Sequence, residues 1–242
     1  FQVTIPNAAN KILVVQGACE DSNDIDCDFS NVQYARFGGS DLSLAVSQLS
    51  DNFEYVASSA IFYLLDDEIN VECSNSFPCT KNVEIRMNNR AVNLHGGAYL
   101  LYNVDQSGAA TMFSYGQDPA GSNYFNTNIN TLTNKSWIID VAAVGNTGTF
   151  VPDEDQIEVW QQSCIGSSSI SSRKLVNNIE NTNVGHAHSN VNRFAHSMVV
   201  IEPFSTSLAP WTNVNFDLSS CINNPSLANN VNLRMSFDPA FR

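Results

Sequence analysis

The sequence predicts an all-β protein, an antiparallel β-sandwich of jelly-roll or Greek-key type with few short helices and with disulfide bonds as staples. Two observations predict this class: many short apolar or alternating runs lie between turns rich in Asn, Gly, Ser and Pro, and helical periodicity is scarce. The hydrophobic content, 43% of 242 residues, allows a sizeable core. We expect one domain over residues 1–242, or two sandwiches in close contact.

The first strands are expected at the N-terminus. Residues 1–5 alternate apolar and polar side chains, as in a strand with one buried face, and they end at Pro6. Residues 11–15 follow at once as a second strand. Residues 32–37 alternate again and end at a pair of glycines, so they predict a third strand.

Residues 40–53 fit two structures. The spacing of Leu42, Val46 and Leu49 matches one face of a helix, whereas the alternation of Leu42, Leu44 and Val46 matches a strand. Because Ser and Asp, which can cap a helix, precede these residues, we favour a short helix.

The clearest strand pattern lies in the middle of the chain. Residues 82–88 alternate and return through an Asn-Asn turn to residues 91–94, which predicts an antiparallel hairpin with one face in water. The turn-rich residues 117–134 are either a lobe boundary or a long surface loop. The other expected strands are 53–56, 60–65, 98–104, 109–115, 136–144, 156–160, 197–201, 214–218 and 231–237.

The charge of the chain excludes two classes of partner. With 11 basic and 24 acidic residues, the net charge of −13 repels nucleic acid and anionic membrane surfaces. No apolar run approaches the length of about 20 residues that spans a bilayer, so we expect no membrane insertion. Because the chain begins at Phe1 rather than Met, we expect a processed protein or an excised piece of one.

The six cysteines predict three disulfides. Four of them form two close pairs, and the last two are left as a distant third pair. A zinc site is the alternative, but the CxxC spacing of zinc ribbons does not occur. Disulfides indicate an oxidising compartment, so we expect an extracellular or cell-surface protein. The expected bonds are Cys19–Cys27, Cys73–Cys79 at the end of a hairpin, and Cys164–Cys221.

An acidic loop after the second strand is the candidate calcium site. Its carboxylates recur at nearly alternate positions, and such oxygens suit Ca²⁺. The glycine and the terminal glutamate of an EF-hand loop are missing, so we favour a solvated loop held by a disulfide, with calcium as the alternative. We expect no cofactor apart from this possible calcium ion. The candidate ligands are Asp21, Asp24, Asp26 and Asp28.

Three histidines are the candidate ligands for a transition metal. If they lie in a strand, His186 and His188 point to the same side, and His196 could be a third ligand. The neighbouring Asn, Ser and Gly residues instead predict a loop with exposed or hydrogen-bonded histidines. We therefore rank calcium in the acidic loop above a metal at the histidines. His95 precedes two glycines, and this triplet predicts a turn.

No catalytic signature surrounds these residues, since GxSxG, HExxH, P-loop and dinucleotide motifs are all missing from the sequence. The sequence therefore favours an extracellular structural or adhesive subunit of a surface filament over an enzyme. A terminal strand, residues 1–15, could complete a neighbour's sheet, and head-to-tail repetition would give an open filament of identical subunits. Alternatively, it lies in its own sheet. The expected assembly residues are Phe1, Val3, Ile5, Ile12 and Val14.

Two other functions fit the sequence. A secreted, lectin-like module would bind glycans through exposed aromatic residues, for which Trp211 on an expected loop is the candidate. A glycan-cleaving hydrolase would need a carboxylate pair, and nothing marks one. Asn134 begins a sequon, so it could carry an N-glycan.

Overall fold

The computed structural model describes residues 1–21, 27–51, 55–88, 93–106, 112–118, 123–164, 166–204 and 214–217. These residues confirm the all-β class, because they form antiparallel strands with one α-helix and one short 3-10 helix among them. The jelly-roll or Greek-key type and the single domain stay predictions. No helix in the described ranges is long and apolar enough to cross a membrane.

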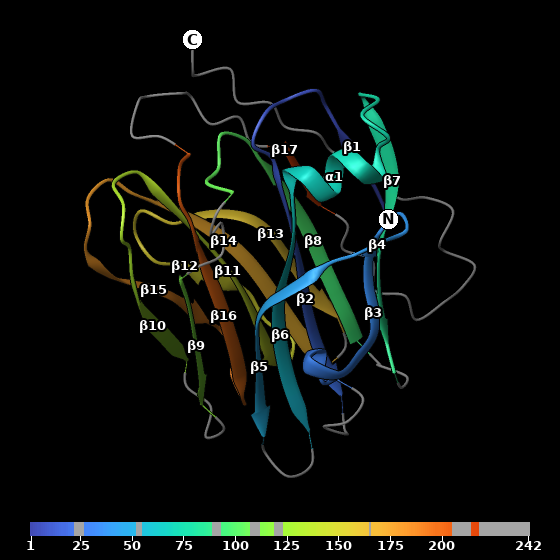
Figure 1. The fold of residues 1–242 in the computed structure, drawn as a ribbon. Coiled ribbons are helices and arrows are strands. Elements are labelled where there is room, and N and C mark those ends of the chain that lie inside the picture. The colour runs from blue at the N-terminus through green and yellow to red at the C-terminus, as the bar shows by residue number, and fades with distance from the viewer. Residues whose placement is uncertain are drawn as a thin grey trace.

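The described strands form four antiparallel sheets, which we number I to IV (Figure 1). Sheet I has the order β1 (Gln2–Ile5), β7 (Cys79–Met87), β3 (Val32–Phe37) and β4 (Ser40–Asp41). Sheet II has the order β17 (Val214–Asp217), β8 (Asn93–Leu101), β2 (Ile12–Asp21), β6 (Val56–Leu65) and β5 (Ser43–Asp51). Sheet III has the order β13 (Ile157–Cys164), β14 (Ser167–Val176), β11 (Ser136–Gly145), β16 (Phe194–Ile201) and β9 (Met112–Asp118). Sheet IV has the order β10 (Tyr124–Asn130), β15 (Asn181–His188) and β12 (Phe150–Pro152).

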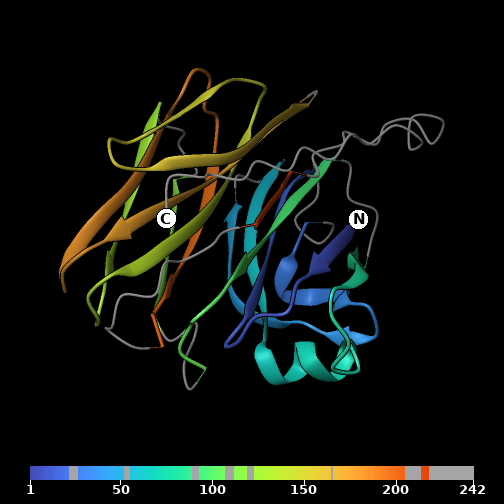
Figure 2. The ribbon, with the colours of Figure 1, turned by 90° about the horizontal axis from the view of Figure 1, so that it is seen from above.

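The sheets stack in their numbered order, and a buried apolar layer fills each space between them (Figure 2). The first layer joins sheets I and II, with Val3 and Leu13 among its members. Val14 and Val141 belong to the layer between sheets II and III. Between sheets III and IV the apolar side chains include Ile129, from β10. Sheets II and III are therefore covered on both faces.

This stacking explains the two kinds of strand sequence. Every residue of β2 and of β16 is buried, because these inner strands have no solvent face, and apolar residues predominate in both. The outer strands β7 and β10 alternate buried and exposed residues instead. The predictions of strands at 11–15, 82–88, 136–144 and 197–201 are confirmed, because each lies within or almost entirely within a described strand. The predicted hairpin from 82–88 to 91–94 is wrong, because β7 and β8 belong to different sheets.

The preference for a helix at 40–53 is wrong. The described residues of this range form β4 (Ser40–Asp41) and β5 (Ser43–Asp51), and β5 pairs antiparallel with β6. A shift of the register between Leu44 and Val46 places an extra residue in β5, as in a β-bulge. Leu42, just before β5, is buried in the layer between sheets I and II, whereas Val46 is buried in the layer between sheets II and III. Buried residues four positions apart occur in strands as well as in helices, so their spacing alone did not identify the strand.

A short helix that the sequence did not predict, α1 (Asp66–Glu72), follows β6 directly. Acidic residues fill its first turn, where they interact favourably with the helix dipole, and Glu68 Oε2 accepts a hydrogen bond from Leu65 N at 3.1 Å. The Cys73–Cys79 disulfide joins the end of this helix to β7, so the predicted hairpin at this place is wrong.

Two predicted disulfides are confirmed. Cys19 bonds Cys27 and Cys73 bonds Cys79, with Cα–Cα distances of 5.6 and 5.7 Å. Cys164 is disulfide-bonded as well. Cys221, its predicted partner, lies outside the described residues.

A set of polar contacts crosses the apolar layer between sheets II and III. Gln16 Nε2 donates to Asp140 O at 2.9 Å, and Gln16 Oε1 accepts from Trp160 Nε1 at 3.1 Å. Ser59 and Tyr99 of sheet II bond hydroxyls of sheet III. We call these bonds, with that between His95 Nδ1 and Ser169 Oγ, the inter-sheet polar contacts.

The His95 triplet lies inside β8, so the predicted turn is wrong. Its glycines allow close packing instead. A Cβ atom at Gly97 would lie 2.4 Å from Trp160 Nε1, and one at Gly96 would lie 2.7 Å from Gln16 O.

Candidate functional site

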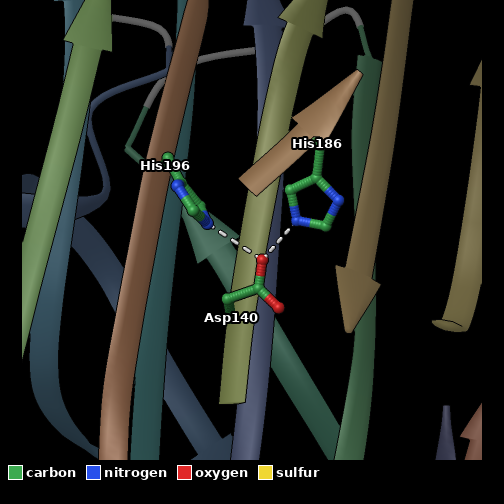
Figure 3. A group of neighbouring side chains, drawn as sticks. All are labelled: Asp140, His186 and His196. Atoms are coloured by element: carbon green, nitrogen blue, oxygen red, sulfur yellow. Dashed lines mark hydrogen bonds and ion pairs between the residues drawn. The ribbon is translucent and has the colours of Figure 1, made fainter. Parts of the chain in front are cut away.

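Asp140, His186 and His196 form a cluster between sheets III and IV, which we call the Asp–His–His cluster (Figure 3). Asp140 lies on β11. His196 lies on the neighbouring β16 opposite Ala142, so its side chain shares a face of sheet III with Asp140. His186 comes from β15 of sheet IV. The exposed fraction is 1% for Asp140 and 0% for each histidine.

One carboxylate oxygen binds both imidazoles. Asp140 Oδ2 lies 2.6 Å from His186 Nε2 and 2.9 Å from His196 Nε2. The other oxygen, Oδ1, accepts hydrogen bonds from Ser172 N at 3.1 Å and from Ser172 Oγ. On the outer side, His196 Nδ1 lies 3.1 Å from Thr127 Oγ1, whereas the buried His186 Nδ1 has no hydrogen-bond partner among the described residues.

Burial and the neighbouring histidines shift the pKa of the Asp140 carboxyl group in opposite directions. Burial raises the pKa of Asp140, but the charges and hydrogen bonds of His186 and His196 outweigh it and lower that pKa below its usual value. Burial lowers the pKa of His196, because it disfavours the charged imidazole more than the hydrogen bond and the charge of Asp140 favour it. Asp140 is therefore an anion throughout the neutral range.

Phenylalanine rings surround the cluster. The ring centroid of Phe125 lies 5.6 Å from that of His186 and 5.5 Å from that of His196, and Phe194 stacks on Phe125 at 4.1 Å. Phe150 meets His186 edge-on at 6.0 Å. These rings separate the cluster from solvent. A cluster enclosed in this way can hold a proton or an ion, but it offers no surface to a large substrate.

The structure brings together two of the three predicted histidines. The predicted loop around them is wrong, because β15 and β16 carry them as buried residues. His188 does share a face with His186, but its ring packs on Phe150 at 4.4 Å and its Nδ1 accepts from Asn190 N at 3.2 Å. Asp140 was not predicted as their partner.

The predicted calcium ligands are described only in part. Asp21 ends β2 and is buried. Asp28 Oδ1 accepts from Ser30 N at 2.8 Å and so caps the 3-10 helix η2 (Phe29–Asn31). Asp24 and Asp26 lie outside the described residues, as does Trp211, the predicted glycan contact. Calcium binding thus stays a prediction, and so does a glycan at Asn134, which is exposed.

A hollow of about 590 Å³ opens on the surface beside α1. Its floor includes Lys11, whose Nζ donates to Ala8 O at 2.7 Å and to Asn70 Oδ1 at 3.0 Å and pairs with Asp66. The other lining residues are Asn7, Ala9, Asn75, Ser76 and Phe77. The hollow therefore presents amide groups and one aromatic ring. The ammonium group of Lys11 is already hydrogen-bonded and paired with Asp66.

The lowered pKa of His95 makes the free energy of unfolding depend on pH. Burial lowers the pKa of His95 from 6.5 to about 4. The unfolded chain thus binds this proton at a higher pH than the folded chain, and stability falls as the pH decreases from 6.5 towards 4. The loss from this group is about 3 kcal/mol.

Urea unfolding at several pH values measures this loss, and a His95→Gln variant is the comparison. We expect the variant to lose less stability than the parent chain between these pH values. Identical pH profiles would contradict a neutral, buried His95.

No protein-family model matches the chain, and no curated protein or solved structure is significantly similar to it.

Proposed function

We propose that the protein is a structural or adhesive subunit of an extracellular assembly, and that copies join by exchanging strand β1. One observation carries the proposal: β1 lies at the edge of its sheet, and its apolar side chains enter the core. Val3 and Ile5 are both 0% exposed, and β1 pairs with β7 alone among the described strands. The two disulfides suit an oxidising, extracellular setting.

The position of β1 allows exchange between copies. β1 ends sheet I, so it can leave without displacing another described strand. Residues 6–11, which connect it to β2, span about 20 Å when extended. Residues 12–15 belong to β2, which pairs with β6 and β8, so the donated segment would stop before them.

The contacts of β1 are equally available to a neighbour's β1. Burying a side chain such as Val3 or Ile5 stabilises by roughly 1.5–3 kcal/mol whichever copy supplies it. Ile5 lies opposite Cys79, whose disulfide holds the start of the receiving strand in place. High local concentration, as on a cell surface, therefore decides between a closed monomer and a head-to-tail chain.

A cross-linking experiment tests the exchange. Thr4 and Thr80 lie opposite each other on exposed positions, with their hydroxyls 2.8 Å apart. We expect a Thr4→Cys chain mixed with a Thr80→Cys chain to form disulfide-linked dimers under assembly conditions, seen by mass mapping without reduction. A chain with both changes shows that the geometry permits the bond.

The matched control mixes Gln2→Cys with Thr80→Cys, because Gln2 lies opposite Asn82 instead. It should give few dimers. If the mixed Thr4 and Thr80 variants give none, and the unmodified chain stays monomeric at high concentration, strand exchange is wrong.

A glycan-binding function is the second candidate. The surface hollow favours it, because amide side chains and an aromatic ring together match the donors, acceptors and apolar faces of sugars. Screening the native chain on a glycan array tests this candidate, and a blank array would remove it.

A further inference from the structure

The Asp–His–His cluster has the atoms of a metal site. Two imidazole nitrogens and one carboxylate oxygen, each on a different strand, lie within 4.8 Å of one another. We propose that this cluster binds one zinc ion, which joins sheet III to sheet IV as a structural centre. This proposal is independent of strand exchange and of the hollow.

The donor set selects the ion. Imidazole nitrogen and carboxylate oxygen are ordinary zinc ligands, whereas Ca²⁺ needs six to eight oxygens and the cluster turns only Asp140 Oδ2 inwards. Tetrahedral zinc with bonds of about 2.0–2.1 Å holds its ligand atoms about 3.3 Å apart. The present separations of 2.6 and 2.9 Å must therefore widen by about 0.7 and 0.4 Å.

The contacts around the cluster suit ligands of this kind. Ser172 holds Asp140 Oδ1 through its backbone N–H and its hydroxyl, so Oδ2 is the oxygen turned to the histidines. When Nε2 of His196 binds an ion, its Nδ1 carries the proton and can donate to Thr127 Oγ1, 3.1 Å away. Metal-bound histidines commonly use their second nitrogen in this way.

The burial of the cluster suits an ion that holds the sheets together, while its three residues fill three of the four positions of tetrahedral zinc and leave the fourth to a water molecule. All three residues are buried, and Phe125, Phe150 and Phe194 cover them. Asp140 and His196 belong to sheet III and His186 to sheet IV, so an ion bound by all three holds the two sheets together. The ion would enter during folding, before the sheets close.

Metal content after controlled refolding tests the proposal. The native chain, with its disulfides intact, is unfolded in a chelator and refolded with or without Zn²⁺. We expect one zinc per chain by elemental analysis and a higher melting temperature for the zinc-refolded chain. Refolding with Co²⁺ should give the visible absorption of a tetrahedral ion.

Variants separate the cluster from other binding positions. His186→Gln and His196→Gln should weaken zinc binding by about 100-fold or more. The matched control is His188→Gln, since His188 is buried on the same face of β15 but lies outside the cluster. This control should keep full occupancy.

The refolded native chain decides the question even if the variants fail to fold. A chain that regains its circular dichroism with no stoichiometric zinc and no change in melting temperature would overturn the proposal and leave a cluster that binds protons only. Equal zinc in the folded His186→Gln, His196→Gln and His188→Gln chains would place the ion elsewhere, and stoichiometric copper or iron in place of zinc would overturn the choice of metal.

Discussion

Replacing Asp140 with alanine is expected to lower the free energy of unfolding by about 3–5 kcal/mol, as when one partner of a buried charged network is removed. The change removes the acceptor of His186 Nε2, His196 Nε2 and Ser172 N, all in a region where water does not replace it. It also leaves a cavity between sheets III and IV.

Urea unfolding in the presence of a chelator measures this loss without any contribution from a metal. Glu158→Ala is the control, because Glu158 is an exposed carboxylate on β13 and its removal should change stability by no more than about 0.5 kcal/mol. A loss below about 1 kcal/mol for Asp140→Ala would mean that the cluster does not support the fold.

Removing the guanidinium of Arg193 should have a comparable effect. Arg193 Nη2 donates to Glu20 Oε1 where both residues are buried, with exposed fractions of 3% and 7%. Burial raises the pKa of Glu20, although Arg193 lowers it in part. Arg193→Ala leaves a buried carboxylate without its cation, and we expect a loss of about 3–5 kcal/mol at neutral pH.

The sign of the pH dependence identifies the cause. Without Arg193 the pKa of Glu20 rises further, so the folded variant binds a proton more readily than the unfolded chain, and its deficit shrinks as the pH falls towards 4.5. A double variant, Glu20→Gln with Arg193→Ala, should recover part of the loss at neutral pH. A deficit that is constant with pH, and is unchanged in the double variant, would assign the effect to lost packing alone.

The strands were predictable because their patterns are local. Inner strands such as β11 are apolar runs, and outer strands such as β7 alternate. The errors arose where a long-range feature changes the local pattern. The spacing of Leu42 and Val46 matches a strand and a helix equally well, and the pairing of β5 with β6, which decides between them, is not visible in the local sequence.

The candidate site was predictable only in part. His186 and His196 stand out in the sequence because histidine is rare in this chain, with four in all. Asp140 is their partner only because β11, β16 and β15 meet, and that contact joins residues 46 and 56 positions apart. A signal did exist: Asp140 is the single charged residue in a ten-residue apolar strand, a place where an unpaired carboxylate would be costly.

Two apolar sheet faces can pack in several alignments, since sliding one along the other still buries hydrocarbon. The inter-sheet polar contacts form in one alignment only, because Gln16, Ser59 and Tyr99 reach their hydrogen-bond partners only in that position. Each buried polar group left unbonded by a slide would cost about 1–3 kcal/mol. If these three residues were replaced by apolar ones, sheets II and III would therefore still associate through hydrocarbon. The chain would then fold to a mixture of structures that differ in the alignment of sheet II on sheet III.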